Sequence, residues 1–194
     1  MKLNIIFSAP ERSTGWYYLK AFKNLGIDVK HFGHDNPINR QADFNLLIDA
    51  GAYINRTDIP HPNGYYAIDN YGVSERHAGI ISSLNCNVVF SAQLNTKRTL
   101  ETLLGVSCPP VYWLPNACDP EIHANKIDWN DRYKFAGFIG GIEQGFRGRR
   151  REILNIAENI DSNSNLLRVN DFPYEQMCNI LSECKIGINE CGIE

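Results

Sequence analysis

The sequence lacks several features that would place it in a class at once. None of its apolar runs approaches the ~20 residues of a membrane-spanning helix, and the first residues carry no secretory signal. Its 19 Lys and Arg against 22 Asp and Glu give a net charge of −3, so no basic excess favours nucleic-acid binding. These absences predict a cytoplasmic protein with no transmembrane segment and no nucleic-acid partner.

The sequence also lacks paired metal ligands. Its six cysteines stand at irregular spacings without a Cys-x-x-Cys pair, and it contains no Asp-x-Asp. Zinc sites use ligands at short paired spacings, and disulfide frameworks belong to oxidising compartments. We therefore expect no metal, no cofactor and no disulfide framework, and we expect the cysteines to act as small buried apolar side chains.

Short apolar runs alternate with segments of helical periodicity through the first two thirds of the chain. We expect strands at residues 2–8, 28–32, 44–48, 65–69, 87–91 and 111–114, and helices at 16–25, 74–84 and 96–104. The segment 55–64 is polar and contains two prolines and a glycine, so it predicts a loop. Strands that alternate with helices at this interval are typical of an α/β fold with a parallel, doubly wound sheet.

The pattern starts again after an aperiodic stretch at 117–132, which we interpret as the connection between two domains. The second set comprises strands at 134–139, 166–169 and 185–188, and helices at 149–160 and 174–182. We therefore predict two Rossmann-like domains, 1–125 and 126–194. The second holds half of a doubly wound sheet, and we expect it to be incomplete at Glu194.

A segment rich in glycine and arginine follows the strand expected at 134–139. Gly140 and Gly141 let the backbone approach a ligand, and Arg147 and Arg150 offer paired N–H donors to a phosphate beside a helix N-terminus. Cations in a first helical turn oppose the helix dipole, and a bound anion would relieve this cost. The segment therefore predicts a phosphate-binding site.

Two familiar nucleotide motifs do not fit this segment. Phe146 and Arg147 stand where a P-loop needs Lys and Ser or Thr, and the glycine spacing is not that of a dinucleotide-binding turn. The alternative to phosphate binding is a solvated basic turn beside acidic side chains such as Glu143 and Glu152.

Four further candidate site residues lie at the end of a predicted strand or in the segment that follows one. Asp69 closes a predicted strand and His77 lies one turn into the next helix, so the pair could bind a sugar hydroxyl or remove its proton. We predict both as catalytic, with a structural histidine as the alternative for His77. Asp119 and His123 follow the strand at 111–114, and we place them at the seam between the domains. The alternative for Asp119 is a cap on the turn at Pro120.

A series of segments shares its order and spacing with one known family: Ile68-Asp69 with Arg76-His77, 87–93, 113–123, 135–140 with 150–154, 174–177 and 185–189. Together they resemble the spore maturation protein CgeB-like family of glycosyltransferases, over roughly residues 43–194.

The resemblance implies a GT-B fold, in which two Rossmann-like domains bind the acceptor and the nucleotide-sugar respectively. It implies transfer of a sugar from a nucleotide-diphosphate donor to a glycan or other hydroxyl acceptor, without an essential metal, and it places Gly140, Gly141, Arg147 and Arg150 beside the donor diphosphate. Members of the family continue beyond the strand at 185–188 into an Arg-x-Phe-Glu motif that contacts the donor. The resemblance therefore also implies a chain truncated in its donor domain and inactive by itself.

Two other functions stay open. A non-catalytic module could bind a carbohydrate or a partner through residues 1–125 alone. A sugar-nucleotide epimerase of similar two-domain build would not release free nucleoside diphosphate on addition of an acceptor.

Overall fold

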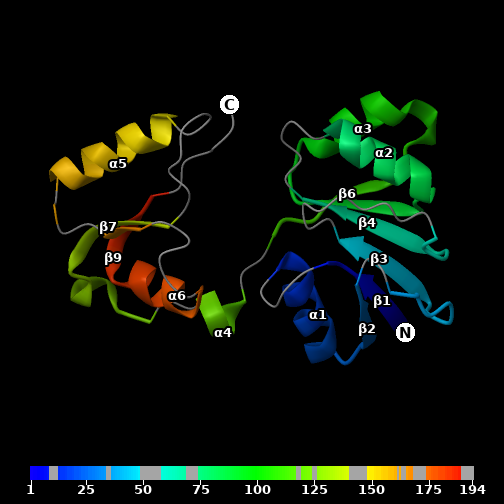
Figure 1. Cartoon of the computed structure of the whole chain (residues 1–194), viewed down its shortest axis with the longest axis horizontal. Helices are drawn as coiled ribbons and strands as arrows, with labels where there is room; N and C mark the ends of the chain where they lie inside the picture. Colours follow the sequence, from blue (N-terminus) through cyan, green and yellow to red (C-terminus); the bar gives the residue numbers. More distant parts are fainter. Residues whose placement is uncertain are drawn as a thin grey trace. The chain divides into compact units, whose positions relative to one another are not determined.

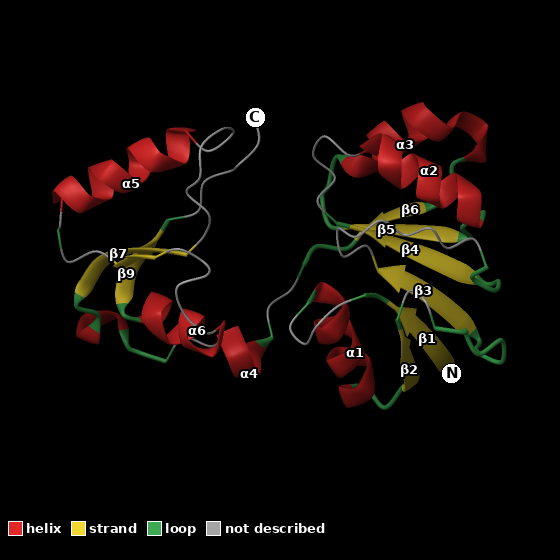
Figure 2. Cartoon of the chain, in the orientation of Figure 1, coloured by secondary structure: helices red, strands yellow, loops and turns green. Residues whose placement is uncertain are grey.

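The structure is a computed structural model that divides into two compact units, Met1–Ala117 and Cys118–Glu194 (Figure 1). Each unit has a parallel sheet with helices on its faces, as Figure 2 shows. The predicted α/β, Rossmann-like fold with a smaller second domain is thereby confirmed. The structure describes residues 1–8, 13–33, 36–48, 58–68, 74–116, 119–123, 126–139, 148–160, 162, 165–167 and 174–188.

The first unit contains a six-stranded parallel sheet in the order β2-β1-β3-β4-β5-β6. Its strands are β1 (Lys2–Ile6), β2 (Asp28–Phe32), β3 (Phe44–Ile48), β4 (Asn63–Ala67), β5 (Val88–Ser91) and β6 (Val111–Trp113). The central strands are buried on both faces, which explains why they read as nearly continuous apolar runs in the sequence.

The loop predicted at 55–64 is wrong at its end, because β4 begins at Asn63. Asn63 and Gly64 pair in register with Asn45 and Leu46 of β3. Gly64 extends the strand because the sheet has no room for a side chain there: a Cβ would lie 2.7 Å from the Phe44 ring. The glycine of this segment therefore reflects close packing within the sheet as well as a turn.

Helices cover the two faces of this sheet separately, with α1 (Thr14–Asn24) on one face and α2 (Ser74–Leu84) and α3 (Thr96–Leu104) on the other (Figure 1). Successive strand residues point to opposite faces, so neighbouring residues join different cores. The α1 face buries Ile5, Phe7, Leu19, Leu46 and Tyr66, and the α2–α3 face buries Ile6, Leu47, Tyr65, Ile81 and Leu100. Each such side chain stabilises the fold by ~1.5–3 kcal/mol.

The start of α1 is fixed by a cap and by one close contact. The Ser13 hydroxyl accepts a hydrogen bond from the Trp16 backbone N–H at 3.3 Å and so caps the helix. Gly15 lies directly on the Phe7 ring, and a Cβ at this position would overlap the ring atoms. The first turn of α1 therefore rests against the residue that follows β1.

Three buried asparagines form a row across the sheet near the amino ends of β1, β3 and β4. Asn4, Asn45 and Asn63 are at most 2% exposed and pair with one another in register. Asn4 Nδ2 donates to Asn45 Oδ1 at 2.8 Å, and Asn45 Nδ2 donates to the Pro60 carbonyl at 2.9 Å. Asn63 Nδ2 reaches the Leu84 carbonyl at 3.3 Å. This asparagine row ties three strands to the connections that enter and leave them.

The second unit contains a three-stranded parallel sheet in the order β8-β7-β9. Its elements are β7 (Lys134–Ile139), β8 (Asn165–Leu167), β9 (Cys184–Gly187), α4 (Pro120–His123), α5 (Gly148–Ile160) and α6 (Tyr174–Ser182). Figure 1 shows α5 and α6 on opposite sides of this sheet.

The segment 117–132, expected to be an aperiodic connection, contains the short helix α4 and a 3-10 turn at Trp129–Asp131. Residues of α4 contact α6, so this segment belongs to the second unit. The chain accordingly divides between Ala117 and Cys118, before the boundary predicted at 125–126. A helix of four residues is too short to produce a readable apolar period.

We expect Gly15→Ala to lower the free energy of unfolding by ~1–3 kcal/mol, because its methyl group would displace the buried Phe7 ring. Gly79→Ala is the matched control, since Gly79 lies within α2 with nothing within 4 Å of a Cβ. That change should stabilise the protein by ~0.5–1 kcal/mol. Chemical denaturation measures both, and equal effects of the two substitutions would contradict the close contact.

We expect Asn63→Ala to cost ~2–4 kcal/mol, because the Leu84 carbonyl would be left buried without its amide donor. Asn24→Ala, at the exposed end of α1, should change the free energy of unfolding by less than ~0.5 kcal/mol. Urea titrations of both variants provide the comparison. A small effect at Asn63 would show that the asparagine row contributes little to stability.

Candidate functional site

The strand orders of the two units share one feature that locates their candidate sites. In open parallel sheets, ligands bind outside the carboxyl ends of the strands where the strand order reverses. In the first unit β1 lies between β2 and β3, and in the second unit β7 lies between β8 and β9. Each unit therefore has such a point at the carboxyl end of its first strand.

In the second unit, that point is followed at once by the glycine- and arginine-rich segment. β7 ends at Ile139 and α5 begins at Gly148, so residues 140–147 leave the carboxyl end of the central strand and lead into a helix N-terminus. Of the predicted diphosphate ligands, Gly140, Gly141 and Arg147 lie outside the described residues. Their role stays a prediction.

The fourth predicted ligand, Arg150, lies in the first turn of α5. This turn contains no acidic side chain, and its sequence is Gly148-Arg-Arg-Arg151. The backbone N–H groups of the turn have no partner within the helix, and its positive dipole end adds to the arginine charge. The first turn of α5 therefore combines a helix N-terminus with three consecutive arginines in the sequence that follows β7.

In the first unit, His77 lies inside the protein and not on its surface. The side chain is 0% exposed, and its Nδ1 lies 2.7 Å from the Tyr65 hydroxyl. A fully buried imidazole makes no contact with a ligand in this arrangement, and the geometry favours the structural alternative. Asp69 lies outside the described residues, so the predicted catalytic pairing of the two stays a prediction.

A pair of tyrosines near the carboxyl edge of the first sheet was not foreseen from the sequence. The Tyr66 hydroxyl lies 2.9 Å from the Leu114 carbonyl and 2.8 Å from Asn116 Oδ1. The Tyr18 ring of α1 packs edge-on against the Tyr66 ring at 5.1 Å between centroids. The sequence contained a signal for this contact, because the hydroxyl of a tyrosine within a buried strand needs a hydrogen-bond partner.

Burial keeps this tyrosine pair protonated. It raises the pKa of Tyr66, and the hydrogen bond with Tyr18 raises it further. Burial also raises the pKa of Tyr18, with a partly opposing effect of the hydrogen bond to Tyr66. The neutral pair joins α1 and β4 to the segment that follows β6. It therefore holds these three segments together near the carboxyl edge of the sheet.

Asp119 and His123 both act on the turn that begins α4. Asp119 Oδ1 accepts a hydrogen bond from the Glu121 backbone N–H at 2.9 Å, and His123 Nδ1 accepts one from the Asp119 N–H at 2.9 Å. The alternative interpretation of Asp119, a cap on the turn at Pro120, is confirmed by this contact. A functional role at a domain seam stays a prediction for both residues.

The described cysteines form no disulfide with one another; Cys86 and Cys184 are buried as predicted, and Cys108 and Cys178 are partly buried. Burial raises the pKa of the Cys86 thiol to about 12. Cys118 and Cys191 lie outside the described residues.

Within the described ranges, no cluster of three His, Cys, Asp or Glu side chains could hold a metal ion. The helices of the same ranges include none that is long and apolar enough to cross a membrane.

Comparisons of the chain with protein-family models, with curated proteins and with solved structures found no match. The function must therefore be argued from the site itself.

We expect Tyr66→Phe to lower the free energy of unfolding at neutral pH by ~1 kcal/mol, because the hydrogen bonds of the hydroxyl are lost. Tyr112→Phe is the control, since the Tyr112 side chain is 57% exposed and should tolerate the change.

The Tyr66 substitution should also change the alkaline limb of stability. An unfolded tyrosine loses its proton near pH 10, whereas folded Tyr66 keeps it, so the wild-type free energy of unfolding falls as pH rises above ~10. In Tyr66→Phe this fall should be shallower by up to ~1.4 kcal/mol per pH unit. Urea titrations between pH 9 and about pH 11.5 test the difference, and parallel slopes would contradict the raised pKa.

Proposed function

We propose that the chain carries the fold of a metal-independent glycosyltransferase and binds the diphosphate of a nucleotide-sugar through residues 140–150. One observation supports this most strongly. The glycine- and arginine-rich segment starts at the carboxyl end of β7, the point where the strand order of the second sheet reverses, and ends in the first turn of α5. In open parallel sheets this is the preferred position for a nucleotide phosphate.

The proposed chemistry is mainly electrostatic. Gly140 and Gly141 would bring backbone N–H groups close to the diphosphate, while Arg147 and Arg150 would neutralise its oxygens. When the glycosidic bond to the donor breaks, negative charge grows on the leaving diphosphate, and fixed cations stabilise that charge. The helix dipole of α5 acts in the same direction and needs no bound metal.

In this proposal the first unit takes the acceptor at the carboxyl ends of β1 and β3. Asp69 directly follows Ile68 beyond β4 and would accept the proton of the acceptor hydroxyl. The buried His77 would act as a positioning residue, because its hydrogen bond to Tyr65 ties α2 to β4. The tyrosine pair would hold α1, β4 and the segment after β6 together beside this acceptor position.

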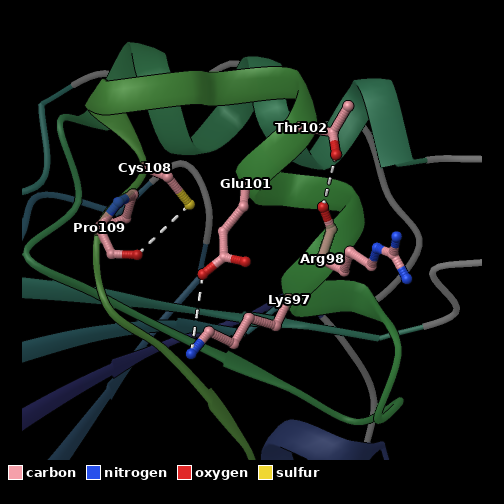
Figure 3. Close-up of polar contacts among 6 residues, drawn as sticks. All are labelled: Lys97, Arg98, Glu101, Thr102, Cys108 and Pro109. Carbon is pink, nitrogen blue, oxygen red and sulfur yellow. Dashed lines mark hydrogen bonds and ion pairs between the residues drawn. The ribbon is translucent and has the colours of Figure 1, made fainter.

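We expect uridine, guanosine or thymidine diphosphate to raise the melting temperature in the presence of EDTA, because a ligand that binds only the folded state stabilises it. The double variant Arg147→Ala, Arg150→Ala should lose this shift. The control is Lys97→Ala with Arg98→Ala on α3, which removes the same charge. Figure 3 shows the Arg98 guanidinium extending away from Glu101, while Lys97 pairs with Glu101 at 3.8 Å.

The absence of a shift with every nucleotide, in a sample shown to be folded, would overturn donor binding. A shift that persists in the Arg147 and Arg150 double variant would place the nucleotide elsewhere. Binding of a glycan without any response to nucleotides would favour the carbohydrate-binding alternative instead.

A further inference from the structure

The first unit contains a polar hollow near the amino ends of β1 and β2. It has a volume of about 130 Å³ and its lining includes Lys2, Asn4, Asp28, Lys30, Asn39 and Gln41. The proposed acceptor position is at the opposite, carboxyl ends of these parallel strands. The chemistry of this hollow is therefore not explained by sugar transfer.

The sheet register brings the charged side chains of the hollow together. Lys2 pairs with Asp28 and Asn4 pairs with Lys30 on the neighbouring parallel strands. Residues two apart on a strand point to the same face, so the four side chains leave the sheet on one side. Within the described part of the chain, neither lysine ammonium forms an ion pair, with Asp28 or with any other carboxylate.

Asn4 gives a second, independent indication of a ligand. Its side chain is 2% exposed, and its Nδ2 donates to the Asn39 carbonyl at 2.6 Å and to Asn45 Oδ1 at 2.8 Å. Its Oδ1 accepts no hydrogen bond from the residues that the structure describes. This oxygen is not among the fully enclosed, unpartnered polar atoms of the described residues, so a ligand in the hollow that carries a proton donor can reach it and pair with it.

The lining residues therefore favour a ligand that carries both anionic oxygens and a hydrogen-bond donor. Anionic oxygens would pair with Lys2 and Lys30, and a donor hydrogen would serve Asn4 Oδ1 and the Asp28 carboxylate. A volume of about 130 Å³ admits only a small ion or molecule. We propose that this hollow is a binding site for inorganic hydrogenphosphate, whose P–O⁻ and P–OH groups meet both requirements.

Binding there would connect parts of the first unit that are distant in the sequence. Lys2 and Asn4 belong to β1, Asp28 and Lys30 to β2, and Asn39 and Gln41 to the connection before β3. A bound phosphate would hold this connection against the first two strands. It would therefore stabilise the edge of the sheet at which β2 lies.

Isothermal titration of the full chain with phosphate and with sulfate, at equal ionic strength, tests the proposal. Sulfate resembles hydrogenphosphate in size and charge but has no proton near neutral pH, so Asn4 Oδ1 and Asp28 would oppose it. We expect one phosphate per chain and sulfate binding weaker by about tenfold or more. Equal responses to the two ions would indicate a general salt effect and overturn the site.

Charge-matched variants locate the phosphate. Lys30→Gln should weaken its binding by about tenfold or more, whereas Lys23→Gln, in α1 on the other face of the sheet, should leave it unchanged. Asp28→Asn should strengthen sulfate binding, because the carboxylate that opposes sulfate is removed. The difference between the phosphate and sulfate affinities should therefore become smaller. Unchanged phosphate affinity in Lys30→Gln would overturn the proposal.

Two further comparisons keep this site separate from the diphosphate site and from phosphate esters. The Arg147→Ala, Arg150→Ala variant should bind inorganic phosphate as the wild type does, and its loss of phosphate binding would overturn the assignment to this hollow. Methyl phosphate has one P–OH group fewer and a bulkier ester oxygen, so it should bind more weakly. Tighter binding of methyl phosphate would contradict the assignment to inorganic phosphate.

Discussion

The fold of the first unit depends on the requirement that buried amide groups find hydrogen-bond partners. Asn4, Asn45 and Asn63 sit side by side within the sheet, and a shift of register by one residue would turn each to the opposite, apolar face. The asparagine row therefore selects one alignment of β1, β3 and β4. It also fixes the start of β4, because Asn63 must reach the Leu84 carbonyl at the end of α2.

The sequence predicted the elements well wherever an apolar period ran for several residues. The helices α2 and α3 and the strand β3 lie where their patterns placed them. Prediction failed where long-range contacts determine the bounds of an element. The strand β4 begins in a polar, glycine-containing segment because it pairs with β3. The tyrosine pair was missed for the same reason, since Tyr66 and its partner Leu114 are far apart in the sequence.

The candidate sites show the same division between local and long-range information. The basic first turn of α5 could be read directly from the sequence, because glycine and arginine spacing is a local pattern. The burial of His77 could not, since it depends on how α2 packs on β4 through Tyr65. Both units place their first strand at the point of strand-order reversal, a property of topology that no short motif contains.

The position of Cys86 gives the first unit a built-in reporter. The thiol is 8% exposed and packs in the core between the sheet and the helices α2 and α3. Since only the thiolate reacts with alkylating agents, and burial raises its pKa to about 12, modification of Cys86 at neutral pH requires this core to open. The rate of its modification would therefore follow the opening of the first unit, without any introduced label.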